Sequence, residues 1–309
     1  MVYPFSTLKI GESMTSEGTT VWEKATKGIS AISYEHIDYA TDKRGLSVLT
    51  FKRPEVLNSF SANMKAEVSH AINTRFRYSP DERALVITGD GDYAFSSGED
   101  LSEINPEWGR NETVDYTRRT LKAYHEIILG ILCTDKPIIA AINGLAFGAG
   151  LSIAIACDYR FGVRSRNIDR CLTVDNNLMP GFSNLGLIPD SGITMTLPRL
   201  IGDTQAGAWF EPKFQISIQE ATVKRVVRVS ASSIADMTER VQNFFYETVL
   251  SGSGIEYAAL KTLRNKELVS RLTRKGGVFD WELQSQTACM LSDFTRQKIR
   301  RYIKKSKNT

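Results

Sequence analysis

Residues 140–158, which read AAINGLAFGAGLSIAIACD, constrain the fold of this chain more than any other segment. The apolar run 138–142 predicts a buried strand, and Asn143-Gly144 predicts a turn after it. Gly148-Ala149-Gly150 then leads into a helical run over residues 151–157. A glycine-rich turn before a helix leaves backbone N–H groups unpaired at the positive end of the helix dipole. The segment therefore indicates a site for an anion or a developing oxyanion, or else tight helix packing that needs small residues.

The composition is that of an ordinary soluble globular protein, with 42% hydrophobic and 24% charged residues in a chain of 309. This length predicts one large domain or two small ones. No apolar stretch approaches about 18 residues, and the N-terminal segment lacks a long apolar core, so we expect neither a membrane partner nor secretion. We expect a cytoplasmic protein, although the sequence leaves an organelle open.

Residues that bind metals or nucleic acids are sparse or scattered. The four cysteines show no CxxC spacing and the three histidines form no HxH or HxxxH pair, so we expect no metal site and a reducing compartment. The net charge of +4 is concentrated in residues 296–309, which carry seven Lys or Arg and no acid. Such a run is typical of a solvated tail or of a site for a phosphorylated ligand. Without the aromatic signatures of RNA-binding domains, nucleic acid is not an expected partner.

Apolar periodicity alternates between strand and helix over the first two thirds of the chain. Strands are predicted as a hairpin at 32–40 and 45–53, and then at 84–88, 137–142 and 159–163. Helices are predicted at 61–78, 114–131, 151–157, 234–249, 256–274 and 281–305. This alternation is typical of stacked ββα or βαβ units. It divides the chain into an N-terminal extension, 1–30, a core, 31–211, and a mainly helical C-terminal region, 212–309.

Four segments in a fixed order carry a family resemblance. The first is Arg53-Pro54-Glu55-Val56-Leu57-Asn58, and the second is Ala94-Phe95-Ser96-Ser97-Gly98-Glu99-Asp100-Leu101. The third is the strand, turn and helix of residues 137–158. The fourth is FSNLGLIPD at residues 182–190, followed by Leu197-Pro198-Arg199. Together, over residues 32–200, these segments resemble the enoyl-CoA hydratase/isomerase (crotonase) superfamily.

This resemblance implies an α/β fold, the crotonase (ClpP-like) spiral of ββα repeats, with a helical C-terminal region that mediates trimerisation or forms a lid. It implies a homotrimer or a dimer of trimers. The expected ligand is the thioester of an acyl-CoA or of an acyl carrier protein. Coenzyme A then enters as part of the substrate, and no separate cofactor is expected. The basic residues from Arg296 onward are expected to help hold the CoA phosphates.

The resemblance also assigns the residues around the thioester carbonyl. By position, the backbone N–H groups of Glu99 and Ala149 form an oxyanion hole, where preorganised donors stabilise the enolate that forms on proton removal. Because a carboxylate near an oxyanion would repel it, we expect the Glu99 side chain to point outward, and a purely structural role for Glu99 stays open. The neighbouring positions expected to line the substrate are Ser97, Gly98, Asp100, Leu101 and Gly148.

The catalytic positions depart from the hydratase pattern. Where hydratases of the family have two glutamates, this chain has Ser152 and Phe182, neither of which exchanges a proton near neutral pH. The remaining acid is Asp190, at the place where isomerases of the family often carry their single acid. Burial among apolar neighbours raises the pKa of a carboxyl, which suits a base that removes a proton at one carbon and returns it at another. We therefore expect an isomerase, although Pro-Asp-Ser-Gly sequences also form ordinary turns.

Other interpretations stay open. In the family's 4-chlorobenzoyl-CoA dehalogenases an aspartate of this loop attacks the aromatic ring, aided by a histidine of the preceding long helix, and His125 lies at a comparable place. Taken alone, His125 is also typical of a packed or surface histidine of a helix. The loss of both glutamates also fits a protein that binds acyl thioesters without turnover, and a hydratase-like reaction is a further option. His125, Ser152 and Phe182 are accordingly expected to contact the substrate. Residues 164–180 look like an insertion before the active-site loop, either an inert surface loop or a lid.

Overall fold

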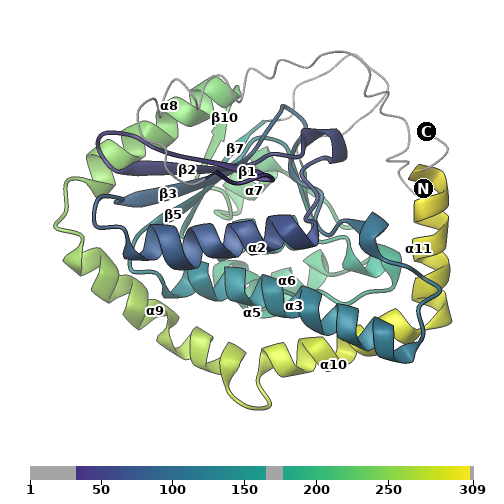
Figure 1. Ribbon diagram of the computed structural model, residues 1–309. Helices are drawn as coiled ribbons and strands as arrows, with labels where there is room; N and C mark the ends of the chain where they lie inside the picture. The colour runs from purple at the N-terminus through teal and green to yellow at the C-terminus, as the bar shows by residue number, and fades with distance from the viewer. Residues whose placement is uncertain (1–32, 165–176, 307–309) are drawn as a thin grey trace.

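The larger of two sheets contains six strands in the order β1-β2-β3-β5-β7-β10, as the computed structural model shows (Figure 1). The structure describes residues 33–164 and 177–306, so the predicted extension 1–30 and most of the predicted insertion 164–180 lie outside the described residues. The strands of this sheet are β1 Ile37–Thr41, β2 Leu46–Phe51, β3 Ala84–Gly89, β5 Ile138–Ile142, β7 Tyr159–Val163 and β10 Val229–Ala231. β1 and β2 form the predicted antiparallel hairpin, and all other neighbours are parallel.

Both faces of this sheet are covered by helices, so its central strands are buried throughout. On one face, Leu85 and Ile87 of β3 join the main core together with residues of α2 (Ala62–His70) and α3 (Arg110–Cys133). On the other face, Val86 packs in a second core with α8 (Ile234–Phe244). Figure 1 shows α8 on one side of the sheet and α2 and α3 on the other. Burial on both faces explains the uninterrupted apolar run of β3, as in other parallel sheets.

Three strands of the smaller sheet alternate along the chain with strands of the larger sheet. The smaller sheet has four strands in the order β4-β6-β8-β9, with bounds β4 Ala94–Ser96, β6 Leu145–Phe147, β8 Asn177–Met179 and β9 Ile216–Ser217. β4, β6 and β8 are parallel, and each follows a strand of the larger sheet along the chain. The pairs β3–β4, β5–β6 and β7–β8 therefore form successive turns of one spiral, which is the fold that the resemblance implies.

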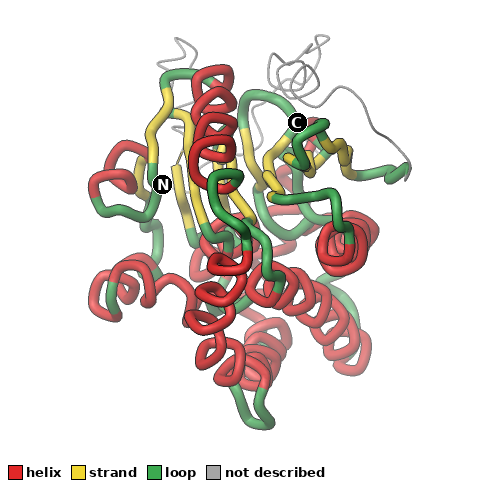
Figure 2. Tube along the Cα trace, turned by 90° about the vertical axis from the view of Figure 1, so that its left-hand side faces the viewer, coloured by secondary structure: helices red, strands yellow, loops and turns green. Residues whose placement is uncertain are grey.

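Helices make up most of the remaining described chain, and Figure 2 shows most of them gathered below the strands. α2 continues into the π-helical turn η3 (Ala71–Phe76). The other helices are α4 Ala149–Ala156, α5 Ile193–Ile201, α6 Asp203–Trp209, α7 Ile218–Val223, η6 Phe245–Val249, α9 Ile255–Thr273, α10 Val278–Leu291 and α11 Asp293–Ser306, with short turns at η2 Pro54–Val56, η4 Leu101–Glu103 and η5 Phe182–Leu185. Among the helices of residues 33–164 and 177–306, none is both long and apolar enough to span a bilayer.

The C-terminal region packs onto the core instead of forming a core of its own. α9 and α10 contact α3, and α11 contacts η4 and η5 (Figure 1). The prediction of a single helix over 281–305 is wrong, because the chain breaks at Ser292, which has an extended ψ of 142°. The Ser292 side chain accepts a hydrogen bond from the N–H of Thr295 at 3.2 Å and so caps the second helix. The three-residue strand β10 is also missing from the prediction, since so short a run shows no periodicity.

α4 is a buried helix whose C-terminal end is closed by a cation. All eight of its residues are buried. The buried side chain of Arg160 donates from Nη1 to the carbonyls of Ala154, Ile155 and Cys157, at 3.5, 3.2 and 2.5 Å. These are carbonyls that a helix end leaves without helical partners, and a cation there also complements the helix dipole. The N-terminal end of α4 begins at Ala149, in the glycine-rich turn.

The turn between Arg53 and Asn58 supports the strand β4. Asn58 is fully buried and has a φ of 55°, a left-handed conformation that asparagine tolerates. Its side chain accepts from the N–H of Arg53 at 3.0 Å and donates to the carbonyls of Asp90 and Ala94, both at 2.9 Å. One side chain thus pairs three backbone groups and fixes the start of β4.

We expect Asn58→Ala to lower the free energy of unfolding by about 3 kcal/mol, because buried backbone groups lose their partner at a left-handed position. The control is Asn105→Ala, which removes one exposed acceptor of the Glu107 N–H and should cost less than about 0.5 kcal/mol. Urea unfolding followed by circular dichroism measures both. Equal stabilities would contradict this role of Asn58.

Candidate active site

Two chain segments meet where the parallel strands β4 and β6 end. Gly98 has a φ of 85°, and a Cβ added to it would lie 2.9 Å from the Phe147 carbonyl oxygen and 3.3 Å from the Ala149 nitrogen. Only glycine permits this approach, because any side chain would displace the backbone opposite. Gly148, with a φ of 54°, takes the second left-handed conformation at this place. Ala149 has no positive φ, so a residue with a side chain is tolerated there.

The meeting point presents two backbone donors. Within the described parts of the chain, neither the Glu99 N–H nor the Ala149 N–H donates to another protein atom. The N–H groups on either side of Glu99 are engaged, since the Gly98 N–H donates to Ser96 Oγ and the Asp100 N–H donates to the Phe60 carbonyl. Two unpaired N–H groups on adjacent segments, one of them at the start of a buried helix, are suited to bind an oxygen that carries negative charge.

The side chain of Glu99 turns into the protein, and the expectation that it points outward is wrong. Its carboxylate accepts from Lys65 Nζ at 2.6 and 2.8 Å, from Tyr116 Oη at 2.6 Å and from Tyr124 Oη at 2.6 Å. Lys65 is only 2% exposed, so a buried cation compensates the carboxylate charge. This pairing removes the repulsion that an unpaired carboxylate would exert on an oxyanion.

Asp100 ties the first two motifs together. It accepts from Arg53 Nη1 at 2.9 Å and from Ser102 Oγ at 2.6 Å. Burial by itself raises the pKa of Asp100, but the hydrogen bonds from Ser102 and Arg53 outweigh burial and lower it. The Ser97 hydroxyl donates to the Val56 carbonyl at 3.3 Å. These contacts fix the backbone on both sides of Glu99, and Leu101 then begins η4 and packs toward α11.

Asp190 is buried at the start of the turn that precedes α5. Its Oδ1 accepts from Ser191 Oγ and its Oδ2 from Gln286 Nε2, both at 2.8 Å. Ser152, fully buried on α4, donates to the Asp190 carbonyl at 3.3 Å. Ser191 and Gly192 have φ of 58° and 73°, so the backbone turns sharply directly after the carboxyl group. Burial and, next, the charge of Glu282 raise the pKa of Asp190 to about 7.

Two side chains of α10 that the sequence analysis missed complete the surroundings of Asp190. Gln286 accepts from the Ile188 N–H at 3.1 Å while it donates to Asp190. Glu282, one helical turn earlier, accepts from the Gly192 N–H at 3.0 Å. The available signal was their spacing, because both lie on the buried stripe that Phe279 and Met290 define.

His125 of α3 joins the same cluster. Its Nε2 lies 3.1 Å from Glu282 Oε2, and its ring stacks on Phe279 with centroids 3.6 Å apart. Burial lowers the pKa of His125 to about 4, against the charges of Asp190 and Asp280, so its imidazole is neutral at pH 7. Glu282 therefore links His125 to the turn that follows Asp190.

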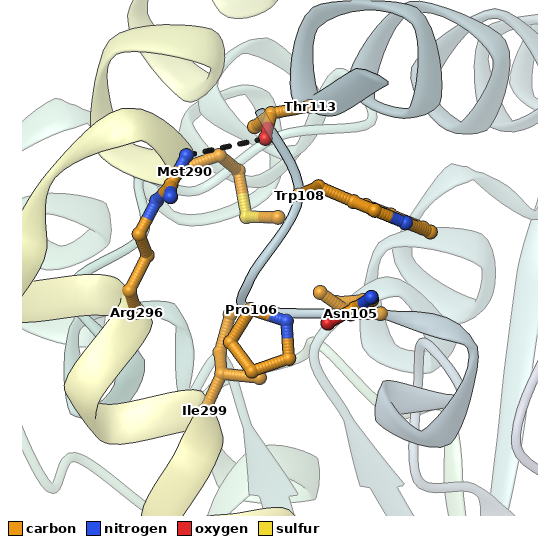
Figure 3. Close-up of a pocket in the computed structure, with 8 residues that line it drawn as sticks. Asn105, Pro106, Trp108, Thr113, Met290, Arg296 and Ile299 are labelled. Carbon is orange, nitrogen blue, oxygen red and sulfur yellow. Dashed lines mark hydrogen bonds between the residues drawn. The ribbon is translucent and has the colours of Figure 1, made fainter. Parts of the chain in front are cut away.

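A small pocket lies one turn of α10 beyond Gln286. Its lining residues come from the segment before α3, from α3 itself and from α10 and α11, namely Ile104, Asn105, Pro106, Trp108, Thr113, Met290, Arg296 and Ile299. Figure 3 shows Arg296 reaching toward Thr113, to whose Oγ1 it donates at 3.3 Å. Arg296 is thus engaged inside the protein, and Arg300 pairs with Glu107. Phe182, the other expected substrate contact, is buried in the main core.

Comparison with known sequences gives a family match over most of the chain. The family model described as enoyl-CoA hydratase/isomerase matches residues 41–308. A probable enoyl-CoA hydratase of Rhodobacter capsulatus is 35% identical over 57% of this chain, which spans 60% of that relative. 4-Chlorobenzoyl coenzyme A dehalogenase-2 of an Arthrobacter species is 32% identical over 68% of this chain and 69% of its own. 1,2-Epoxyphenylacetyl-CoA isomerase of Escherichia coli is 28% identical over 74% of this chain and 84% of that relative.

Solved structures show the same fold. Human mitochondrial delta3-delta2-enoyl-CoA isomerase superposes with a TM-score of 0.75 at 21% identity, over 89% of this chain and 99% of that one. An enoyl-CoA hydratase of Bacillus halodurans superposes with a TM-score of 0.73 at 20% identity, over 86% and 100%. The ordered motifs, the spiral of strand pairs and the family match agree, and the chain belongs to the enoyl-CoA hydratase/isomerase (crotonase) superfamily.

Proposed function

We propose that this chain shifts a double bond in an acyl-CoA or acyl-carrier thioester, from the 3-enoyl to the 2-enoyl position, with Asp190 as the only proton carrier. The observation that supports this proposal most is the position of Asp190. Its backbone is bonded to Ser152, on the first turn of the helix whose first N–H belongs to Ala149. Base and oxyanion donor thereby share one rigid frame.

The reaction needs one base that works at two carbons. In a 3-enoyl thioester the proton at C2 is acidified by both the carbonyl and the alkene. Ionised Asp190 takes that proton, and the electron pair moves to the thioester oxygen as a dienolate, which the N–H groups of Glu99 and Ala149 stabilise by roughly 3 kcal/mol each. Asp190 then returns the proton to C4, so that the enzyme ends unchanged. Two of the approximately four lone pairs of the carboxylate are occupied by Ser191 and Gln286, which leaves others for the substrate.

The proposal includes no dissociable cofactor, because each step moves only a proton. We place the distal part of the acyl group toward the pocket beside Met290, one turn of α10 from Gln286. Exposed cations then bind the CoA phosphates in this proposal. Arg301 and Lys304 of α11 are exposed and suit this role.

A second candidate is nucleophilic dehalogenation, which the Arthrobacter relative and the position of His125 favour. Ionised Asp190 would attack the ring carbon that bears chlorine, chloride would leave, and water would hydrolyse the resulting aryl ester. Release of chloride from 4-chlorobenzoyl-CoA, without turnover of 3-enoyl thioesters, would support this reaction over the isomerase. Binding of both thioesters without turnover of either would leave a binding protein.

We expect Asp190→Asn to lower the rate of isomerisation at least about 10²-fold while substrate binding survives, because the amide keeps the shape but accepts no proton. We expect Ser152→Ala to lower the rate less than about tenfold, since the Ser152 hydroxyl neither gains nor loses a proton near neutral pH. Asp236→Asn, the same change in the first turn of α8, where the carboxylate accepts from the Ser232 hydroxyl, is the matched control and should leave the rate unchanged. The measurement is the absorbance of the product of a 3-enoyl-CoA. Wild-type activity in Asp190→Asn would refute the assignment.

The pH dependence follows from the raised pKa of Asp190. The base is active when ionised, so kcat/KM should rise with pH, with a midpoint near 7, and level off above it. A solvated aspartate, with a pKa of about 4, would give a flat profile over the same range. The folded state also binds this proton more tightly than the unfolded chain, so the free energy of unfolding should fall as pH rises from about 4 to about 7. Rates measured between pH 5 and 9, and unfolding measured between pH 4 and 9, test both expectations.

We also propose a homotrimer held by the C-terminal helices. Large apolar side chains are exposed there, with Ile255 76%, Leu263 72%, Trp281 63% and Phe294 60% exposed. Unpartnered apolar surface of this kind is typical of an interface. We expect light scattering to give about three times the mass of one chain, and Leu263→Glu to lower that mass, while Lys224→Glu, an exposed site outside these helices, leaves it unchanged. A monodisperse monomer at micromolar concentration would contradict this proposal.

A further inference from the structure

We propose that Glu282 on α10 is a second carboxyl of the active site, a positioning residue that ionises before Asp190 and makes Asp190 a stronger base. This inference rests on the proposed role of Asp190 as the proton carrier. Glu282 has no counterpart in the sequence motifs and comes from the helical C-terminal region. Glu282 belongs to a cluster with Asp190, Gln286 and His125.

Both carboxylate oxygens of Glu282 have hydrogen-bond partners. The residue is only 3% exposed. Its Oε1 accepts from the Gly192 N–H at 3.0 Å and from Thr194 Oγ1 at 3.2 Å, and its Oε2 lies 3.2 Å from the same N–H. His125 Nε2 lies 3.1 Å from Oε2. We assign the Nε2–H tautomer to His125, because an ionised carboxylate only accepts hydrogen bonds.

This set of donors favours the ionised form of Glu282 over that of Asp190. Glu282 receives hydrogen bonds from one backbone N–H, one hydroxyl and one imidazole, whereas the Asp190 carboxylate receives one from Ser191 and one from Gln286. Donors to a carboxylate stabilise its charge, so Glu282 loses its proton first as pH rises. Burial acts against this and raises the pKa of Glu282 to about 7, which the hydrogen bonds from Gly192, Thr194 and Ser191 oppose. The pKa of Asp190 reaches about 7 with the charge of Glu282 already acting on it, which is the order of ionisation that the donors favour.

The charge on Glu282 then acts on Asp190 and is opposed only in part, by Ser191, His125 and Gln286. The groups that face the pair are Ser152 of α4, Tyr124 and His125 of α3, Asp280 and Gln286 of α10, and Ser191 and Thr194 of the turn itself. None of these groups is a cation at neutral pH, and no Lys or Arg of the described chain forms an ion pair with either carboxyl. A neighbouring negative charge disfavours ionisation of Asp190 and so strengthens it as a base.

Glu282 reaches the substrate only through Asp190. Both of its oxygens are occupied by the turn at residues 192–194 and by His125, which leaves no clear approach for a reacting carbon. No proton passes through Glu282 in the reaction. Asp190 alone accepts the proton from C2 and returns it to C4, and Glu282 keeps the same charge throughout. This division of roles differs from that of a hydratase, in which two carboxyls act on water and substrate.

The test is Glu282→Gln, which keeps the size and one acceptor oxygen but removes the charge. The midpoint of the kcat/KM profile should fall by about one pH unit, because Asp190 loses the charge that opposes its ionisation. On the plateau kcat should fall by about two- to fivefold, because the base is weaker, whereas KM should stay within about twofold. Glu282→Asp retains the charge at a greater distance and should give a midpoint between those of the wild type and Glu282→Gln.

The matched control is Glu82→Gln, the same change at a buried carboxylate that binds Tyr39 and Thr41, outside the cluster. It should leave the midpoint unmoved. Circular dichroism checks that each variant is folded, and if Glu282→Gln fails to fold, Glu282→Asp carries the test. An unmoved midpoint in the folded Glu282 variant, or an equal shift in Glu82→Gln, would overturn the inference.

A titration without turnover separates this inference from the proposed function. The ¹³C carboxyl signal of Asp190, identified by its absence in Asp190→Asn, can be followed with pH in the free protein. If it titrates about one unit lower in Glu282→Gln while the wild type isomerises no 3-enoyl thioester, the proposed function fails and the pairing of the carboxyls holds. If the wild type is active and the signal titrates identically in both proteins, the pairing fails and the proposed function holds.

Discussion

The close approach of Gly98 to the Phe147–Ala149 backbone is the contact on which the rest of the site depends. It is possible only because β4 and β6 are parallel neighbours whose carboxyl ends reach the same edge of the smaller sheet. The same tightness recurs one residue further on, where a Cβ on Gly150 would lie 2.8 Å from the Ser96 carbonyl oxygen. The packing of the glycine-rich turn and the oxygen binding that we propose for it therefore depend on the same arrangement. The glycines serve the packing, and the packing aims the two N–H groups.

The two buried carboxyl clusters around this contact are compensated differently. Glu99 has a buried lysine and two tyrosine hydroxyls on its carboxylate, so its charge is balanced next to the place where an oxyanion would form. Asp190 has neutral donors and a second carboxyl. The cation is placed where a negative charge would oppose the reaction, and it is absent from the described surroundings of the group that is proposed to be the base. The two carboxyls thus differ in whether a buried cation pairs with them.

Much of the core could be predicted from the sequence, because its signals are local. The apolar run 84–88 predicts a strand buried on both faces, and the four motifs give the order of the spiral. The partners of the site residues could not be predicted in this way. Lys65 reads as a solvated helix residue, and Glu282 lies 90 residues from Gly192 along the chain. Only the packing of α2, α3 and α10 against the site shows that these polar side chains face inward. The helix break at Ser292 was likewise hidden, since helical periodicity continues through it.

The cap on α4 has an electrostatic consequence for the opposite end of that helix. Arg160 covers the C-terminal carbonyls, so the partial negative charge of that end is cancelled by a full positive charge. The helix is eight residues long, which places this charge about 12 Å behind the Ala149 N–H. At an effective dielectric constant of about 20, a unit charge at that distance stabilises an anion by about 1 kcal/mol. Arg160 is thus a remote counter-ion, which adds to the potential at the proposed oxyanion hole although a buried helix separates it from that place.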